Sequence, residues 1–340
     1  MSNTGAIVPI VLIFIASFLF AVTATPLVRR FALVVGFVDQ PNARKLHASP
    51  IPLLGGLAMY AAFVGAVVFF GGEQFINQFV GILLGATLVS FLGIWDDLRP
   101  MSAYVKLGGQ VLGALILVIT NVEVEFLHNP VLNIVLTVLW VTGITNALNL
   151  LDNMDGLSGG IAAIAAAFFT LLAALNGQFL VGGLAAALFG VSIGFLFYNF
   201  NPATIFMGDA GSLFLGFMLA AVGIKLRFPT QTDTVTWMIP LFVLGIPIFD
   251  TTLVFISRLR QGKNPLTTPG KDHLSHRLLK LGLTTRPAVI TIYAVSVVLG
   301  LVGLGIQYTT FPIAYTVLAL VIVIAVVGFG WFIRNEEGAR

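Results

Sequence analysis

Two adjacent carboxylates, Asp96 and Asp97, close an apolar run in the segment FLGIWDDLRP. Each carboxylate raises the electrostatic cost of ionising the other. A helix C-terminus also favours cations over anions, so a divalent metal ion or the nearby Arg99 and Lys106 would have to compensate the pair. On these residues alone two interpretations stay open: the end of a membrane span, or a cation site.

The segment NALNLLDNMDGLSGG, residues 146–160, carries polar side chains at helical spacing. Asn146, Asn149 and Asp152 recur every three residues, which aligns them on one face of a helix end. Asp155 and Gly156 predict the turn that follows. An ordinary connection between spans does not need so many amides and carboxylates, so the pattern favours a functional site.

A similar group lies in YNFNPATIFMGDAGS, residues 198–212. Asn199 and Pro202 predict the end of one span, and Asp209 stands where the next one begins. Asp209 could be a plain helix N-cap. Glycines on both sides of it would alternatively let backbone amides approach a phosphate.

Two basic segments complete the set of candidates. DQPNARKLHASPIPLLGG, residues 39–56, carries Lys45 and His47, and the long segment 258–287 contains HLSHR. One helical turn would present His273, His276 and Arg277 together. Arg and protonated His bind phosphate oxygens by charge-assisted hydrogen bonds. The alternative is a basic segment that lies on anionic lipid.

Asp250 differs from the other carboxylates because it stands inside an apolar stretch, PLFVLGIPIFDTTLVF. Pro240, Gly245 and Pro247 predict that this stretch is kinked or broken. An ionisable residue within a span is a candidate functional residue. A role in chemistry and a role in satisfying backbone groups freed by the break are both open.

The elements that must position these residues are membrane helices. The 340-residue chain is 58% hydrophobic and 9% charged, whereas soluble domains carry about 25% charged residues. Its apolar stretches are long enough to span a bilayer and do not alternate as the strands of a barrel would. We predict an all-α polytopic protein with about eleven spans near 6–28, 51–71, 76–95, 103–120, 131–149, 157–175, 178–198, 211–226, 235–257, 286–306 and 310–333.

The basic residues predict the orientation. With the N-terminus outside and the C-terminus in the cytoplasm, all 17 Lys and Arg residues except Lys225 and Arg227 fall on the inner side. Apart from Asp250, the Asp residues of the candidate segments then face the cytoplasm too. Carboxylates bind Mg²⁺, and Mg²⁺ binds phosphates. The residues therefore indicate a metal-assisted phosphoryl-type displacement beside the membrane, with a lipid as one substrate.

Five segments, in this order, resemble the polyprenyl-phosphate N-acetylhexosamine-1-phosphate transferase family: RKLHASPIPLLGG, GIWDDL, NALNLLDNMDGL, NPATIFMGDAGS and HLSHRLLKLG. The resemblance implies transfer of a sugar 1-phosphate from a UDP-N-acetylhexosamine to undecaprenyl or another polyprenyl phosphate, releasing UMP. It implies Mg²⁺, or Mn²⁺ in its place, and the cytoplasmic leaflet of the bacterial plasma membrane. The family starts cell-envelope polymers such as O-antigen lipopolysaccharide and wall teichoic acid.

The resemblance also implies roles for individual residues. Asp96 matches the proposed base for the lipid phosphate and Asp209 the principal Mg²⁺ ligand. Asp97 matches a catalytic carboxylate that is also a metal-binding residue and lies next to the metal or the lipid phosphate. The matched nucleotide-binding residues are Asn149, Asp152, Asp155, Asn199 and Phe206. The matched phosphate- or sugar-binding residues are Lys45, His47, Lys106, His273, His276 and Arg277. We expect one catalytic domain, residues 1–340, with its site in loops 29–50, 96–106, 149–160, 199–212 and 258–286.

The last segment departs from the family pattern, because Gly270 and Ser275 stand where relatives commonly have Asp and His. A muramoyl-pentapeptide transferase is the alternative within the family, and the missing run of three His argues against it. A secondary transporter is the alternative from another class. It would hold its ionisable groups near the bilayer midplane, often with an internal repeat. We expect membrane lipids as partners and no nucleic acid, and a homodimer is left open.

Overall fold

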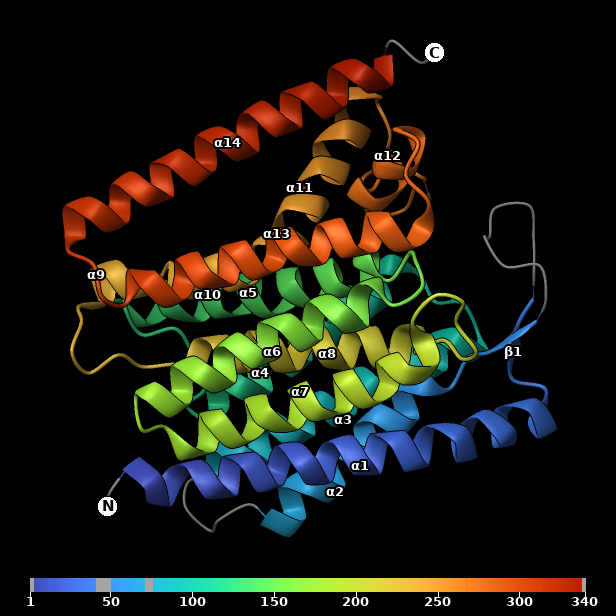
Figure 1. The fold of residues 1–340 in the computed structure, drawn as a ribbon, viewed down its shortest axis with the longest axis horizontal. Helices are drawn as coiled ribbons and strands as arrows, with labels where there is room; N and C mark the ends of the chain where they lie inside the picture. Colours follow the sequence, from blue (N-terminus) through green and yellow to red (C-terminus); the bar gives the residue numbers. More distant parts are fainter. Residues whose placement is uncertain (1–2, 41–49, 71–75, 269, 338–340) are drawn as a thin grey trace. The chain divides into compact units, whose positions relative to one another are not determined.

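The computed structural model describes residues 3–40, 50–70, 76–268 and 270–337 (Figure 1). Most of these residues are helical, and their one sheet is a two-stranded hairpin. The prediction of an all-α polytopic protein is therefore confirmed. Lys45 and His47, two of the predicted phosphate- or sugar-binding residues, lie outside the described residues.

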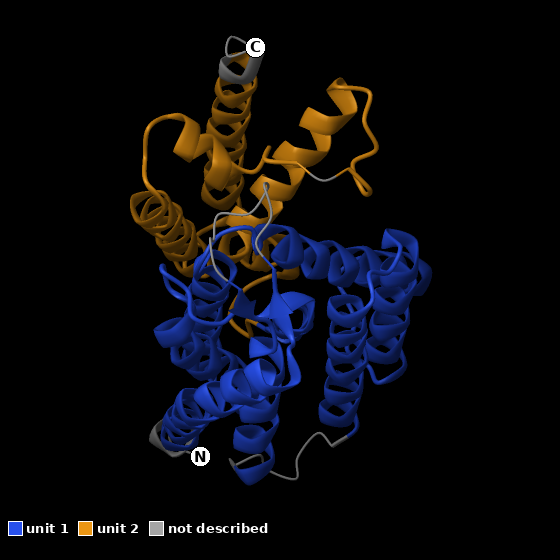
Figure 2. Ribbon diagram, turned by 90° about the vertical axis from the view of Figure 1, so that its right-hand side faces the viewer, with its two compact units in different colours: residues 1–227 blue, residues 228–340 orange. Residues whose placement is uncertain are grey.

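The chain divides into two compact units, residues 1–227 and 228–340, which are coloured separately in Figure 2. The first unit contains α1 (Asn3–Val35), β1 (Val38–Asp39), β2 (Ile51–Pro52), α2 (Gly55–Phe70), α3 (Ile76–Leu98), α4 (Ala103–Ile119), α5 (Pro130–Leu151), α6 (Leu157–Leu175), α7 (Phe179–Asn199) and α8 (Gly208–Lys225). The second contains α9 (Asp233–Thr236), α10 (Ile239–Val243), α11 (Gly245–Arg260), α12 (Leu274–Lys280), α13 (Thr285–Ile306) and α14 (Phe311–Glu337). The expectation of one catalytic domain stays a prediction.

The described residues include eight helices long and apolar enough to cross a membrane. Two of the predicted spans, 51–71 and 103–120, coincide with the shorter apolar helices α2 and α4. The predicted break in the span at 235–257 is confirmed, because the segments Asp233–Val243 and Gly245–Arg260 are bent by 72°. Eleven spans and the orientation across the membrane stay predictions.

A single introduced thiol tests the orientation, because the chain has no Cys. Lys263 is an exposed residue of the loop between α11 and α12. We expect a membrane-impermeant maleimide to label Lys263→Cys from the cytoplasmic side only, as its place among the inner basic residues requires. Thr230→Cys, on the predicted outer side, is the matched control and should label from the opposite side. Labelling of position 263 from the outer side alone would overturn the orientation.

Helix α8 is the core of the first unit, where it packs against α2, α3, α5, α6 and α7 and is the most buried of the long apolar helices. Its first turn approaches two other backbones. A Cβ atom on Gly93 of α3 would collide with backbone atoms of Asp209 and Ala210, and a Cβ on Gly56 of α2 would collide with Gly211. These glycines let three helices meet at the start of α8.

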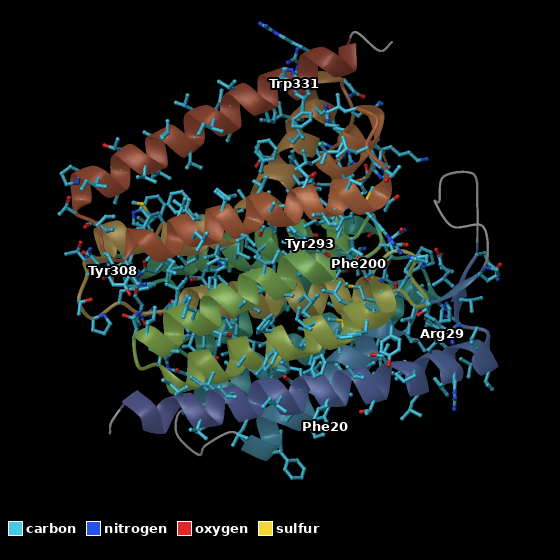
Figure 3. The ribbon with its side chains drawn as sticks, in the orientation of Figure 1. Phe20, Arg29, Phe200, Tyr293, Tyr308 and Trp331 are labelled. Carbon is cyan, nitrogen blue, oxygen red and sulfur yellow. The ribbon has the colours of Figure 1, made fainter. Side chains whose placement is uncertain are left out.

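The end of α1 is also tied to the segment before α8. Arg29, labelled in Figure 3, donates a hydrogen bond from Nε to the carbonyl oxygen of Thr204, at 3.0 Å. The antiparallel hairpin that follows α1 pairs Val38 with Pro52 and Asp39 with Ile51. Arg29 and strand β2 thus both contact the segment that leads into α8, Arg29 at Thr204 and Pro52 of β2 at Phe206.

Candidate active site

The N-terminus of α8 is capped by a side chain from α3. Gly208 begins the helix with φ +68°, a conformation that favours glycine. Asp97 accepts the backbone N–H of Asp209 at Oδ1 (3.0 Å) and that of Ala210 at Oδ2 (3.3 Å). A carboxylate at this end satisfies free N–H groups and complements the helix dipole. The reading of Asp209 as a plain N-cap is therefore wrong, because Asp97 caps the helix.

The side chain of Asp209 faces a cation held between two carboxylates. Lys106 Nζ lies 2.6 Å from Asp209 Oδ2 and 2.9 Å from Asp96 Oδ2. Asp96 Oδ1 also accepts the backbone N–H of Met101, at 2.5 Å. Ser102 caps α4 by accepting the Val105 N–H, which places Lys106 in the first turn of that helix. Of the two cations that the sequence offered, Lys106 is the one seen to compensate the carboxylates.

The polar face predicted at the end of α5 also reaches Asp209. Asn149 Nδ2 donates to Asp209 Oδ1 and to Ser212 Oγ, both at 2.9 Å. One turn earlier, the amides of Asn146 and Gln110 hydrogen-bond each other. Gln110 and Ser212 were not among the predicted site residues. The spacing of Gln110 from Lys106, one turn apart within an apolar span, was the available signal.

Asp152 is the C-cap of α5 and interacts electrostatically with three other carboxylates. The pKa of Asp152 is raised to about 8, mainly by burial and also by the negative charges of Asp209, Asp97 and Asp155. No hydrogen bond to its carboxylate is found among the described residues. This carboxylate is therefore the one in the group most in need of a positive charge.

Asp155 and Asn199 connect the loop after α5 to the loop after α7. Asp155 Oδ2 accepts Asn201 Nδ2 (2.9 Å) and the Ala203 N–H (3.0 Å). Asn199, which is 2% exposed, accepts the Gly156 N–H and donates to the Ile205 carbonyl oxygen. Their predicted contact with a nucleotide stays a prediction, as does that of Phe206. In the structure, the hydrogen bonds of Asp155 and Asn199 join the loop after α5 to the loop after α7.

The segment PIPLLGG, residues 50–56, pairs its backbone with the residues that lead into α8. Phe206 donates its N–H to the Pro52 carbonyl oxygen at 2.8 Å, and its own carbonyl oxygen accepts the Gly55 N–H at 2.9 Å. Gly56 donates to the carbonyl oxygen of Met207 at 2.8 Å. This backbone pairing holds the residues that immediately precede Asp209.

In the second unit, the loop that carries HLSHR is anchored to α11 by hydrogen bonds to two carboxylates, Asp250 and Asp272. Asp250 is fully buried; it accepts the Leu274 N–H at 2.6 Å and lies 2.8 Å from His273 Nδ1. Arg258 donates twice to Asp272, at 2.8 and 3.0 Å. Burial works against ionisation of Asp272, yet the Arg258 guanidinium holds the pKa of Asp272 below its usual value.

Arg277 and His276 differ in their surroundings. Arg277 is 4% exposed and donates to the Asp272 carbonyl oxygen, to Ser257 Oγ and to the Phe332 carbonyl oxygen. His276 is half-buried; burial lowers its pKa, and the charges of His273 and Lys271 lower it further. Phosphate or sugar binding by this turn stays a prediction, and Arg277 already uses its donors within the second unit.

The carboxylates at the start of α8 fit a metal ion whose remaining ligands come from a substrate and water. Among the described residues, no three His, Cys, Asp or Glu side chains are grouped as a closed metal cage. Mg²⁺ seldom needs one, because one or two carboxylates usually hold it together with substrate phosphates and water. Asp96 and Asp209, which already share the Lys106 ammonium, are a pair of that kind.

Comparison with known proteins gives consistent matches. The model of "Glycosyl transferase family 4" matches residues 79–227. The "Probable undecaprenyl-phosphate N-acetylglucosaminyl 1-phosphate transferase" of Bacillus subtilis is 36% identical over 296 residues, covering 84% of this chain and 82% of that protein. The decaprenyl-phosphate N-acetylglucosaminephosphotransferase of Mycolicibacterium smegmatis is 31% identical over 332 residues, with coverage of 86% and 82%. The undecaprenyl-phosphate alpha-N-acetylglucosaminyl 1-phosphate transferase of Salmonella typhimurium is 28% identical over 311 residues, with coverage of 87% and 83%.

Proposed function

This chain belongs to glycosyl transferase family 4, and from that premise we propose that it transfers N-acetylglucosamine 1-phosphate from a UDP-linked donor to a polyprenyl phosphate. An oxygen of the lipid phosphate attacks the phosphorus that carries the sugar. The bond from that phosphorus to UMP breaks, so the products are polyprenyl-diphosphate N-acetylglucosamine and UMP. The observation that carries the proposal is the meeting of Asp96, Lys106 and Asp209 at the capped N-terminus of α8.

The contacts of each residue support a specific role in the proposed reaction. Asp97 positions Asp209 by fixing the first turn of α8. Lys106 offers a positive charge to a diphosphate, and Asp96 accepts hydrogen bonds, as a group that holds the proton of a lipid phosphate must. Asp209, with Asp96, would hold Mg²⁺. When bound, that ion neutralises charge on the phosphates during transfer.

We place the reaction at the cytoplasmic leaflet of a bacterial plasma membrane. The support is the concentration of Lys and Arg on one side of the predicted spans, the side that also carries the site. In this setting the reaction is the first membrane step of an envelope polysaccharide. The relatives named above are all N-acetylglucosamine phosphate transferases, which gives no support to the muramoyl-pentapeptide alternative.

Release of UMP is the direct test of the proposal. The purified protein is incubated in detergent with undecaprenyl phosphate, Mg²⁺ and, separately, UDP-N-acetylglucosamine, UDP-N-acetylgalactosamine and UDP-glucose. We expect UMP only when the lipid and the metal are both present, and fastest with UDP-N-acetylglucosamine. Omission of the lipid is the matched control for hydrolysis. Absence of UMP with every donor would refute the proposal.

A further inference from the structure

Two amide side chains pair with each other one helical turn away from the site residues of α4 and α5. Gln110, which is 1% exposed, follows Lys106 by four residues, and Asn146 precedes Asn149 by three. Gln110 Nε2 donates to Asn146 Oδ1 at 3.2 Å, and Asn146 Nδ2 donates back to Gln110 Oε1. Asn146 Nδ2 also donates to the Thr142 carbonyl oxygen at 2.8 Å, which ties this amide to its own helix. The proposed reaction assigns no role to the reciprocal pair.

The two helices that carry the pair also hold Asp209 from two sides. Lys106 Nζ lies 2.6 Å from Asp209 Oδ2, and Asn149 Nδ2 donates to Asp209 Oδ1 at 2.9 Å. Residues three or four apart lie on the same face of a helix. Lys106 therefore shares a face of α4 with Gln110, and α5 presents both of its Asn side chains on one face. Helices α4 and α5 are thus connected twice in succession, directly by the amide pair and indirectly through Asp209.

The rest of the buried face of α4 consists of small or apolar residues. Apart from Gln110, its buried residues are Gly109, Gly113, Ala114 and Leu117. Such residues let helices pack closely, but apolar contact is not directional. A reciprocal amide pair is directional, because each N–H must point at the oxygen of the other amide. A buried Asn fixes the register of helices in coiled coils in the same way.

We propose that Gln110 and Asn146 are positioning residues whose amide pair fixes the register of α4 against α5 and so holds Lys106 on Asp209. The inference rests on the proposed function, in which the Lys106 charge faces the diphosphate. A slip of one residue moves a helix by about 1.5 Å, and misplacement by about 1 Å can lower turnover about 100-fold. The amides can therefore affect the reaction without touching a substrate.

Paired substitutions separate positioning from simple stabilisation. Gln110→Leu and Asn146→Leu each leave one amide without its partner, so each should lower the thermal unfolding midpoint. Replacing both members of a buried polar pair by apolar residues is often close to neutral. The midpoint of the double variant Gln110→Leu/Asn146→Leu should therefore return to near that of the unmodified protein, while its kcat/KM stays roughly 10- to 100-fold lower.

Two results for this double variant would overturn the proposal. Full kcat/KM would show that the pair has no influence on the site. A midpoint lowered by the sum of the two single losses would show that the amides do not act as a pair.

An exchange of the two amides is the matched rescue. Gln110→Asn together with Asn146→Gln keeps two facing amides and the total length of the two side chains. We expect the exchange to recover most of the kcat/KM that each single change loses. A loss equal to the product of the two single losses would show that the residues act independently and would contradict the proposal.

Tyr60→Phe is the control for the loss of a hydrogen bond between helices. Tyr60 Oη lies 2.6 Å from Thr87 Oγ1, in a contact that joins α2 to α3. Its removal breaks one such bond in the same unit and leaves α4 and α5 untouched. kcat/KM should stay unchanged.

The placement of Lys106 can be measured without any substrate, so the inference can fail separately from the proposed function. Its side chain is 19% exposed and its ammonium group faces two carboxylates, so the amine should react slowly with an acylating reagent. Lys263, which is exposed, is the internal reference. We expect acylation of Lys106, quantified by mass spectrometry, to be faster in Gln110→Leu/Asn146→Leu and slow again in the exchanged variant.

The outcomes for the two claims are then distinct. Unchanged reactivity of Lys106 in Gln110→Leu/Asn146→Leu would overturn the inference even if UMP release is normal. Absence of UMP with every donor, together with the expected change in Lys106 reactivity, would refute the proposed function and leave the role of the amide pair in fixing the register standing.

Discussion

Asp209→Asn is expected to reduce UMP release by roughly 10³-fold. The substitution removes the charge that faces Lys106 and, in the proposed function, the principal carboxylate for Mg²⁺. It leaves the backbone N–H that Asp97 accepts, so the cap of α8 is kept. The measurement is kcat/KM for UDP-N-acetylglucosamine, together with the thermal unfolding midpoint, which should move little.

Asp233→Asn is the matched control for this experiment. Asp233 is an exposed Asp in the first turn of α9, on the predicted outer side, and its neutralisation should leave turnover unchanged. A fully active Asp209→Asn enzyme would remove Asp209 from the metal-binding role. A variant that fails to fold would be recognised by its midpoint, and Asp209→Glu, which keeps the charge, then tests the same role.

Gly93→Ala is expected to damage both stability and activity, although alanine is the smallest side chain that can be added. The new Cβ would meet the backbone of Asp209 and Ala210, which cannot move aside as a flexible side chain can. Overpacking of this kind destabilises proteins by about 1–3 kcal/mol, and contact with backbone puts Gly93 at the upper end. Separation of α3 from α8 would also break the cap from Asp97. The thermal unfolding midpoint and the rate of UMP release should fall together.

Gly143→Ala in α5 distinguishes packing from helix propensity. A Cβ on Gly143 meets nothing within 4 Å, and alanine is favoured over glycine in a helix by about 1 kcal/mol. Gly143→Ala should therefore leave the thermal unfolding midpoint equal to that of the unmodified protein or slightly higher. Equal midpoints for the two variants would contradict the close approach at Gly93.

The polar residues of the site were predictable from their types and spacing. In a chain with few charges, a recurring Asn at helical spacing stands out, and Asn149 does reach Asp209. Lys106 was one of only two cations next to the paired carboxylates, and it forms the contact. Such residues are visible in a sequence because an apolar span has little reason to contain them.

The contacts made by backbone were not predictable in the same way. Asp97 and the amides that it caps are separated by more than 110 residues, and nothing in the segment around Asp97 shows which helix end it will meet. The close approach at Gly93 is equally hidden, because glycine is common in membrane helices for several reasons. The two readings of Asp250 also needed the fold, since its partner His273 lies 23 residues further along the chain.

The Lys106 ammonium between Asp96 and Asp209 has a consequence for the biogenesis of the protein. Two carboxylates facing each other without a cation would repel, and a nascent chain would need a metal ion to bring α3, α4 and α8 together. Here a lysine from the same chain provides the positive charge. The contact between α3, α4 and α8 therefore has its positive charge without a bound metal ion. In the proposed function, the metal ion is then needed for turnover and not for the assembly of these helices.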